Sequence, residues 1–121
     1  MARVLLVEDD ANVLLLLVHV LRGAGYGVDC ADTVKSARSY LERRHYDLVV
    51  ADGKLPDGTG MMIGDVAETK GMITLIITGF AFQLPREHLL RYEYLLKPFR
   101  PSELLRAIER ALNGSTTSPT G

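Results

Sequence analysis

The 121-residue chain lacks the features typical of disulfide scaffolds, zinc-cluster proteins and membrane proteins. It has a single cysteine, Cys30, which excludes an internal disulfide bond and a zinc cluster built from several cysteines. Its longest apolar stretch, Val13 to Val18, ends at His19 and is far shorter than the roughly 20 residues that a helix needs to cross a bilayer. The chain enters its first predicted strand without a basic and hydrophobic leader, so we expect a cytoplasmic protein with no membrane partner.

An excess of charge of one sign is also missing. The chain has 14 Lys and Arg residues against 15 Asp and Glu residues, which gives a formal net charge of -1. A nearly neutral chain creates no field that would gather nucleic acid or anionic lipid, so we expect no nucleic-acid partner. Apolar residues at 47% and charged residues at 24% are ordinary values for one globular domain of this length.

The order of the predicted elements indicates an α/β fold. Five short runs of aliphatic and β-branched residues predict buried strands, and four longer segments show the apolar spacing of helices. The strands are expected at Arg3–Val7, Val28–Ala31, Tyr46–Asp52, Ile73–Thr78 and Tyr92–Leu96, and the helices at Ala11–Gly23, Thr33–Arg44, Gly60–Lys70 and Pro101–Leu112. Because parallel strands need crossover connections, this alternation predicts a doubly wound five-stranded parallel sheet with helices on both faces.

Two segments depart from this alternation. Between Phe80 and Arg91 the pattern supports only a short helix, over Pro85 to Leu89, so we expect a fourth helix that is shortened or irregular. Residues 114–121 are rich in Ser, Thr, Pro and Gly, which is typical of a flexible tail or the start of a linker. The folded domain is therefore predicted to span residues 1–113.

The first predicted helix is apolar on more than one side. The residues expected to point inward are Val13, Leu16, Leu17, Val20 and Ala24. This assignment leaves Leu14, Leu15 and Val18 on the outer side, where a surface helix normally carries charge. Two interpretations stay open: the helix is covered within the domain, or these three side chains form an apolar patch for a partner.

Polar residues stand where the predicted strands end. Glu8 and Asp9 follow the first strand, Asp52 ends the third, Thr78 ends the fourth and Lys97 follows the fifth. In an open parallel sheet the carboxyl ends of the strands meet at one edge, where ligands bind. Three neighbouring carboxylates repel one another unless a cation lies among them, and Mg²⁺ prefers such oxygen ligands. With a hydroxyl and an ammonium beside it, the predicted site suits a phosphorylated carboxylate, with Asp52 at its centre.

Four motifs resemble the receiver domain of two-component response regulators, the CheY-like family with a flavodoxin-like fold. They are Leu6-Val7-Glu8-Asp9-Asp10, Asp52-Gly53-Lys54-Leu55-Pro56, Ile77-Thr78-Gly79 and Tyr94-Leu95-Leu96-Lys97-Pro98-Phe99. The resemblance covers residues 1–113. It implies that Asp52 accepts a phosphoryl group from a phosphohistidine on a sensor histidine kinase or a histidine phosphotransferase.

The resemblance also implies a role for each matching residue. Asp9, Asp52 and the backbone carbonyl of Lys54 would bind Mg²⁺ directly, and Glu8 would bind it through a water. The switch residues would be Thr78, which would hydrogen-bond the phosphoryl oxygens, and Tyr94, which would change rotamer with it. Lys97 would pair with the phosphoryl group, and the Lys97-Pro98 peptide bond would be cis. The implied protein is a phosphorylation-dependent switch and no enzyme beyond its own phosphotransfer and slow dephosphorylation.

The chain departs from the family pattern in two places. The segment from Thr78 to Lys97 is a few residues short, which affects the fourth-helix face that family members use for output and for homodimers. Lys54 and Phe80 occupy positions that border the path of the hydrolytic water in the family. Because both side chains are bulky, we expect slow self-dephosphorylation.

Two other functions are weighed against this one. The first is a receiver-like interaction module that signals without phosphorylation. The second is a phosphatase of small substrates, because Asp57-Gly58-Thr59 resembles part of the haloacid-dehalogenase motif. In that motif the nucleophile precedes the triplet by two residues, where this chain has Leu55. The histidines His19, His45 and His88 lack the spacing of a metal or catalytic site.

Overall fold

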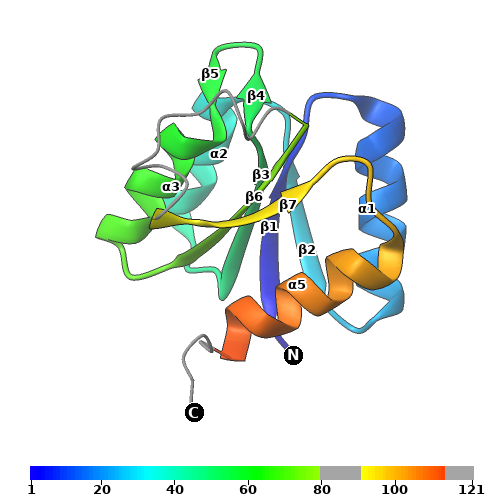
Figure 1. Cartoon of the computed structure of the whole chain (residues 1–121). Coiled ribbons are helices and arrows are strands. Elements are labelled where there is room, and N and C mark those ends of the chain that lie inside the picture. Colours follow the sequence, from blue (N-terminus) through cyan, green and yellow to red (C-terminus); the bar gives the residue numbers. More distant parts are fainter. Residues whose placement is uncertain (80–90, 114–121) are drawn as a thin grey trace.

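The computed structural model describes residues 1–79 and 91–113, and within them it forms a five-stranded parallel sheet (Figure 1). The strands are β1 (Arg3–Val7), β2 (Gly27–Ala31), β3 (Leu48–Asp52), β6 (Ile73–Thr78) and β7 (Glu93–Leu96). Their order across the sheet is β2-β1-β3-β6-β7. The predicted strands and the doubly wound parallel sheet are confirmed. The connections reverse direction between β1 and β3, where ligands bind in this class of fold.

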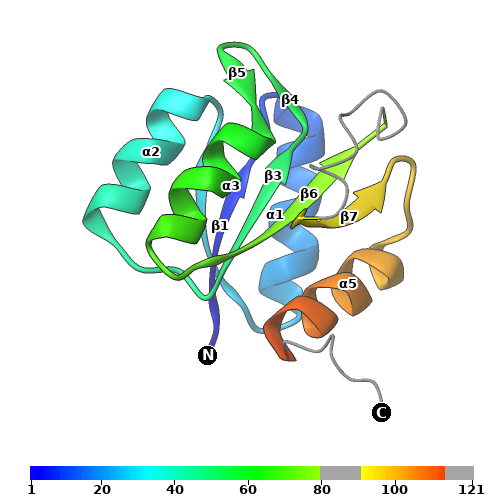
Figure 2. The ribbon, with the colours of Figure 1, turned by 60° about the vertical axis from the view of Figure 1, so that its left-hand side comes forward.

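Within the described residues, two pairs of helices cover the sheet, one pair on each face (Figures 1 and 2). The helices α1 (Ala11–Gly23) and α5 (Pro101–Asn113) share one face, and α2 (Val34–Arg43) and α3 (Gly60–Thr69) share the other. These four helices confirm the predicted ones within one or two residues at each end. The short helix predicted over Pro85 to Leu89 and the tail predicted for residues 114–121 lie outside the described residues. None of the helices in the described part of the chain has the length and apolarity needed to span a membrane.

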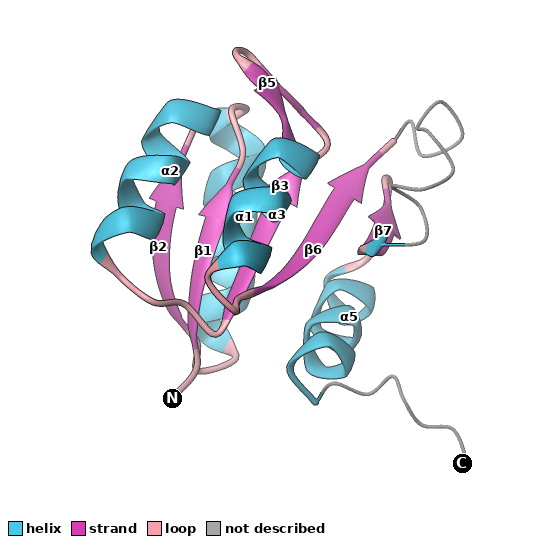
Figure 3. Ribbon diagram, turned by 90° about the vertical axis from the view of Figure 1, so that its left-hand side faces the viewer, coloured by secondary structure: helices cyan, strands magenta, loops and turns pink. Residues whose placement is uncertain are grey.

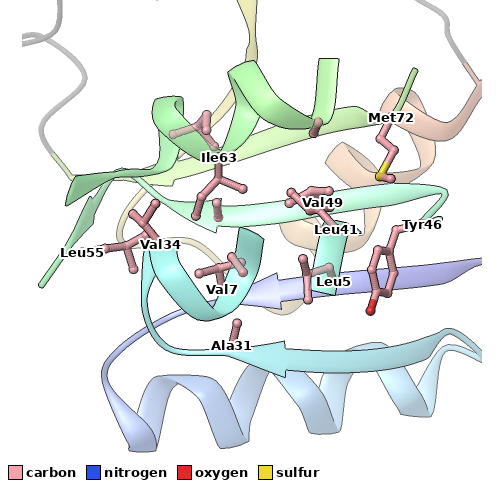
Figure 4. Close-up of a cluster of buried hydrophobic side chains, with 14 of the residues drawn as sticks. Leu5, Val7, Ala31, Val34, Leu41, Tyr46, Val49, Leu55, Ile63 and Met72 are labelled. Atoms are coloured by element: carbon pink, nitrogen blue, oxygen red, sulfur yellow. The ribbon is translucent and has the colours of Figure 1, made fainter. Parts of the chain in front are cut away.

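The central strands are buried on both faces, and this explains their continuous apolar runs. Successive side chains of a strand point to opposite faces, so β1 and β3 each contribute to two cores. Leu5 and Val49 pack under α2 and α3, as Figure 4 shows, whereas Leu6 and Val50 pack under α1 and α5. The strands are therefore held rigidly, and so are the residues at their carboxyl ends.

The inward face of α1 differs from the prediction. Leu17 and Leu21 are its buried residues, and Leu14 and Val18 lie half-buried against the core on the α5 side. Leu16, which was expected to point inward, is 56% exposed. Ala24, also expected inward, is exposed and forms the C-cap of the helix.

The exposed apolar pair on α1 is therefore Leu15 and Leu16, with Leu15 at 69% exposed. The outward prediction is confirmed for Leu15 and is wrong for Leu14 and Val18. The cause is the uninterrupted apolar run from Val13 to Val18, in which hydrophobicity alone cannot tell one helix face from another.

A small antiparallel hairpin follows the third strand of the chain and was not predicted. It pairs β4 (Lys54–Leu55) with β5 (Gly58–Thr59) and projects beyond the carboxyl ends of the sheet strands (Figure 3). Its strands have only two residues each, too few for a hydrophobic period to show in the sequence. The hairpin places the residues after Asp52 above the edge where the predicted site lies.

Candidate functional site

A cleft of about 560 Å³ with several charged residues in its lining opens at the carboxyl edge of the sheet. It is bounded by the ends of β1 and β3, the start of the hairpin and the loop after β7. The described residues that line it are Glu8, Asp9, Asp10, Val13, Asp52, Lys54, Leu55, Pro56, Gly79 and Lys97. The structure thus brings five of the predicted site residues into one cleft: Glu8, Asp9, Asp52, Lys54 and Lys97.

Three carboxylates form the acidic part of this cleft. Glu8, Asp9 and Asp52 each offer an oxygen, and these oxygens all lie within 4.8 Å of one another. Glu8 is 2% exposed and Asp52 is 9% exposed, while Asp9 faces solvent. Burial raises the pKa of Glu8, and the nearby charge of Asp52 adds to the rise. A cation among these oxygens would relieve the repulsion between them.

The donor set fits Mg²⁺. It consists of carboxylate oxygens only, and its exposed member, Asp9, leaves one side open to water. Mg²⁺ is a hard cation that binds through one or two carboxylates and keeps several waters. Thus Glu8, Asp9 and Asp52 could hold this ion together with oxygens of a second ligand.

Lys97 lies opposite the acids and contacts two of them. Its Nζ donates to Oδ2 of Asp52 at 3.0 Å and to Oε1 of Glu8 at 3.4 Å. Partial burial by itself would lower the pKa of Lys97, but the two carboxylates outweigh it and the pKa is raised. The residue therefore keeps its positive charge. The peptide bond that follows, Lys97-Pro98, is cis, as predicted.

The backbone after Asp52 is tied closely to the neighbouring strand. The N–H of Gly53 donates to the carbonyl of Ile77 at 2.8 Å, and the N–H of Lys54 donates to Oδ1 of Asp52 at 3.3 Å. A Cβ on Gly53 would stand 2.9 Å from both Cβ and Oγ1 of Thr78, closer than real side chains approach. Glycine is therefore needed here so that Thr78 can lie against the loop.

The two predicted switch residues occupy neighbouring strands. Thr78 ends β6 and is 2% exposed. Tyr94 lies in β7, opposite Ile76, and packs half-buried against the core under α2 and α3. Burial raises the pKa of Tyr94, which keeps its hydroxyl neutral. The rotamer change shared by these two residues stays a prediction.

One residue with a role at this edge was missed from the sequence. The carboxylate of Asp57, between the hairpin strands, accepts from the N–H of Val34 at 2.7 Å and from the N–H of Lys35 at 3.0 Å. Asp57 thus binds the first turn of α2. No sequence signal could have identified this contact, because more than 20 residues separate the partners. The resemblance of Asp57-Gly58-Thr59 to a phosphatase motif gains no support, since the carboxylate is engaged with α2.

Comparison with known proteins gives a consistent result. The family model described as the response regulator receiver domain matches residues 4–109. An uncharacterized 14.6 kDa protein of Leptolyngbya boryana is 35% identical, over 88% of this chain and 87% of its own. The transcriptional regulatory protein BasR of Escherichia coli K12 is 32% identical over 96% of this chain, but only 56% of BasR is covered. The chain thus spans about half the length of such regulators.

Solved structures show the same likeness. A CheY-like receiver domain protein of Methanospirillum hungatei JF-1 has a TM-score of 0.84 and 28% identity, covering 93% of this chain and 94% of that one. The receiver domain of the sensor histidine kinase PA1611 of Pseudomonas aeruginosa PAO1 has a TM-score of 0.83 and 28% identity, covering 93% and 98%. The PA1611 structure has a magnesium ion coordinated in its active site cleft.

Proposed function

Since this chain belongs to the response regulator receiver domain family of two-component systems, we propose that it is a phosphorylation-dependent switch with Asp52 as its phosphoacceptor. The observation that carries this proposal is the position of Asp52. One of its oxygens contacts the Lys97 ammonium, and the carboxylate belongs to the acid cluster with Glu8 and Asp9. An acceptor that lies between an ammonium and a cation site can receive a group that carries several negative oxygens.

The proposed reaction is the transfer of a phosphoryl group from a phosphohistidine to Asp52. An oxygen of Asp52 forms the new O–P bond as the P–N bond to the imidazole breaks, and the imidazole nitrogen keeps the electron pair and takes up a proton. Lys97 pairs with one phosphoryl oxygen, and the Thr78 hydroxyl donates to another. Both residues stabilise charge on the transferring group.

The proposed metal is Mg²⁺, which would neutralise the phosphoryl oxygens when bound. Asp9, Asp52 and the backbone carbonyl of Lys54 would be its direct protein ligands, and Glu8 would act through a water. The acidic cluster and the PA1611 receiver domain with its magnesium ion support this assignment. We further propose that Lys54, exposed at the mouth of the cleft, slows attack of water on the phosphorylated product. The matching prediction for Phe80 falls outside the described residues.

The proposed switch is electrostatic. A phosphoryl group adds roughly -1.5 to -2 charges and three acceptor oxygens beside Asp52, which would draw the hydroxyl of Thr78 and the ammonium of Lys97 inward. Tyr94 on the neighbouring strand would respond to the movement of Thr78. Changing the surface from mostly inactive to mostly active requires differential stabilisation of about 5.5 kcal/mol.

The proposed phosphodonor is a sensor histidine kinase or a histidine phosphotransferase. Leu15 and Leu16 are the large apolar side chains that α1 exposes. An apolar hollow of about 420 Å³ separates α1 from the loop over Lys97, Pro98 and Phe99. We assign the partner patch to this surface, which replaces the predicted patch of Leu14, Leu15 and Val18.

Intact mass spectrometry after incubation with a small phosphodonor tests the proposal. The wild type should gain one phosphoryl group when Mg²⁺ is present and none when the metal is chelated. Asp52→Ala should gain none, whereas Asp32→Ala, which removes an exposed carboxylate outside the cleft, should behave like the wild type. A folded wild type that takes up no phosphoryl group would contradict the proposal. That result would favour the alternative function, an interaction module that signals without phosphorylation. The exposed Leu15 and Leu16 support this alternative because they offer an apolar surface to a partner.

A further inference from the structure

The hairpin of β4 and β5 connects the proposed metal site to the helices on one face of the sheet. It starts two residues after Asp52, and Lys54, the proposed carbonyl ligand, is its first residue. A metal ligand supplied by a loop is only as well placed as the loop itself. The contacts that hold this hairpin therefore bear on metal affinity.

The base of the hairpin is fixed by the backbone. The N–H of Gly60 donates to the carbonyl of Gly53 at 3.3 Å, and Gly60 packs so closely that an added Cβ would stand 2.4 Å from the carbonyl oxygen of Asp52. The side chain of Thr59 accepts from the N–H of Met62 and caps α3. The end of the hairpin thus runs directly into α3.

The turn of the hairpin is fixed by α2. Asp57 accepts the N–H groups of Val34 and Lys35, one with each carboxylate oxygen. A Cβ on Gly58 would stand 3.1 Å from Cγ2 of Val34, so the turn also packs against the start of this helix. Leu55 is buried in the same hydrophobic cluster as Val34, and both lie at one end of it in Figure 4.

We propose that Asp57 is a positioning residue for the Mg²⁺ site. By holding the turn of the hairpin against α2, it fixes the loop from Gly53 to Lys54 and so the carbonyl proposed as a metal ligand. Asp57 does not itself line the cleft among the described residues, and it acts through the hairpin. This inference rests on the proposed function, because it requires that the cleft binds Mg²⁺.

The chain offers a control that separates positioning from helix capping. Thr33 is the N-cap of α2, and its Oγ1 accepts from the N–H of Ser36 at 3.0 Å. Thr33→Ala therefore weakens the same end of the same helix without touching the hairpin. If Asp57 only stabilised α2, replacing Asp57 and replacing Thr33 would have the same effect on Mg²⁺ affinity.

The test measures the Mg²⁺ dissociation constant by titration calorimetry and the thermal midpoint for the wild type, Asp57→Ala, Asp57→Asn and Thr33→Ala. We expect Asp57→Ala to weaken Mg²⁺ binding about tenfold, at the lower end of the range for residues that position metal ligands. Asp57→Asn keeps one acceptor oxygen and should lose less. Thr33→Ala should lower the thermal midpoint and leave Mg²⁺ affinity within about twofold of the wild type.

Two results would overturn the inference alone. One is an unchanged Mg²⁺ affinity in Asp57→Ala, and the other is an equal loss of affinity in Thr33→Ala. If the wild type binds no Mg²⁺, the metal site of the proposed function is disproved, and so is the inference that rests on it. The wild-type titration therefore separates the two failures.

Discussion

The two helical faces of the sheet meet the functional cleft in different ways. On the α2 and α3 face, hydrogen bonds to the backbone connect the cleft to both helices through Asp57, Thr59 and Gly60. On the α1 and α5 face, the carboxylate of Asp10 lines the cleft and caps α1, and the cleft also borders an apolar hollow beside the exposed Leu15 and Leu16. Both faces thus hold a helix start to the cleft through a carboxylate, and the α1 and α5 face in addition offers an apolar surface to a partner.

The difference also concerns what each face tolerates. Asp57, Thr59 and Gly60 contact backbone groups that no neighbouring side chain can reach in their place, so changes at these three residues should affect folding and the site together. Exposed apolar side chains can be exchanged with little effect on folding, so changes at Leu15 and Leu16 should affect association alone. The predictions below test this division.

Gly60→Ala should have the largest effect. The added Cβ would stand 2.4 Å from the carbonyl oxygen of Asp52, so the backbone of the site must shift. We expect a loss of about 3 kcal/mol in the free energy of unfolding, at the upper end for an overpacked position. Denaturant unfolding measures this loss.

Gly23→Ala is the matched control on the other face. Gly23 is the last residue of α1, and an added Cβ would meet nothing within 4 Å. Removing the flexibility of glycine from a helix should leave the free energy of unfolding unchanged or raise it by about 0.5–1 kcal/mol. If Gly60→Ala were as harmless as Gly23→Ala, the rigid connection between the hairpin and β3 would be disproved.

Replacement of Leu15 and Leu16 by Glu should act on association alone. Both side chains are more than half exposed, so the free energy of unfolding should change by no more than about 0.5 kcal/mol. Phosphotransfer from the partner kinase or phosphotransferase should slow about tenfold or more, because two apolar contacts are lost at the proposed interface. The rate with a small phosphodonor should stay unchanged. Stopped assays with each donor measure both rates.

Met62→Glu supplies the control for this charge change. Met62 is a comparably exposed apolar residue, at 43%, but it belongs to α3 on the opposite face. The variant should receive the phosphoryl group from the partner at the wild-type rate. If Met62→Glu slowed phosphotransfer from the partner as much as the replacement of Leu15 and Leu16, the partner would not bind one face in preference to the other. The proposed patch on α1 would then be contradicted.

The strands and the cleft could be predicted because both follow from burial and topology. A strand covered on both faces carries a continuous apolar run, as at residues 4–7 of β1 and 48–51 of β3, and this run is visible in the sequence. Once the strands are parallel, their carboxyl ends share an edge. Residues as distant as Glu8 and Lys97 must then meet there, and the contact between them is observed.

The features that could not be predicted depend on register or on distant contacts. The inward face of α1 was misassigned because the apolar run offers no polar residue to set the helical phase. The hairpin after Asp52 is too short to show a period. The contact of Asp57 with α2 depends on how the turn of the hairpin meets a helix that precedes it by more than 20 residues.

The smallest effect predicted here depends on pH and isolates the contact between the hairpin and α2. The hydrogen bond from Val34 and, with it, the one from Lys35 hold the pKa of Asp57 below its ordinary value of 3.8. A carboxyl whose pKa is lowered on folding stabilises the fold above its unfolded pKa, and this stability is lost as the pH falls through the folded value. Asp57→Asn cannot titrate. The difference in thermal midpoint between the wild type and this variant should therefore be constant near neutral pH and shrink below about pH 4.

Thermal unfolding followed by circular dichroism, from neutral pH down to about pH 2.5, measures this difference. Thr33→Ala weakens the same end of α2 without removing a titrating group, so its difference from the wild type should stay flat over the same range. A wild-type advantage over Asp57→Asn that persists undiminished in acid would mean that the charge of Asp57 plays no part in holding the hairpin. The connection between the cleft and α2 would then depend on hydrogen bonds to an uncharged Asp57 and on packing at Leu55 and Gly58, whereas α1 on the opposite face keeps the carboxylate cap of Asp10, which lines the cleft.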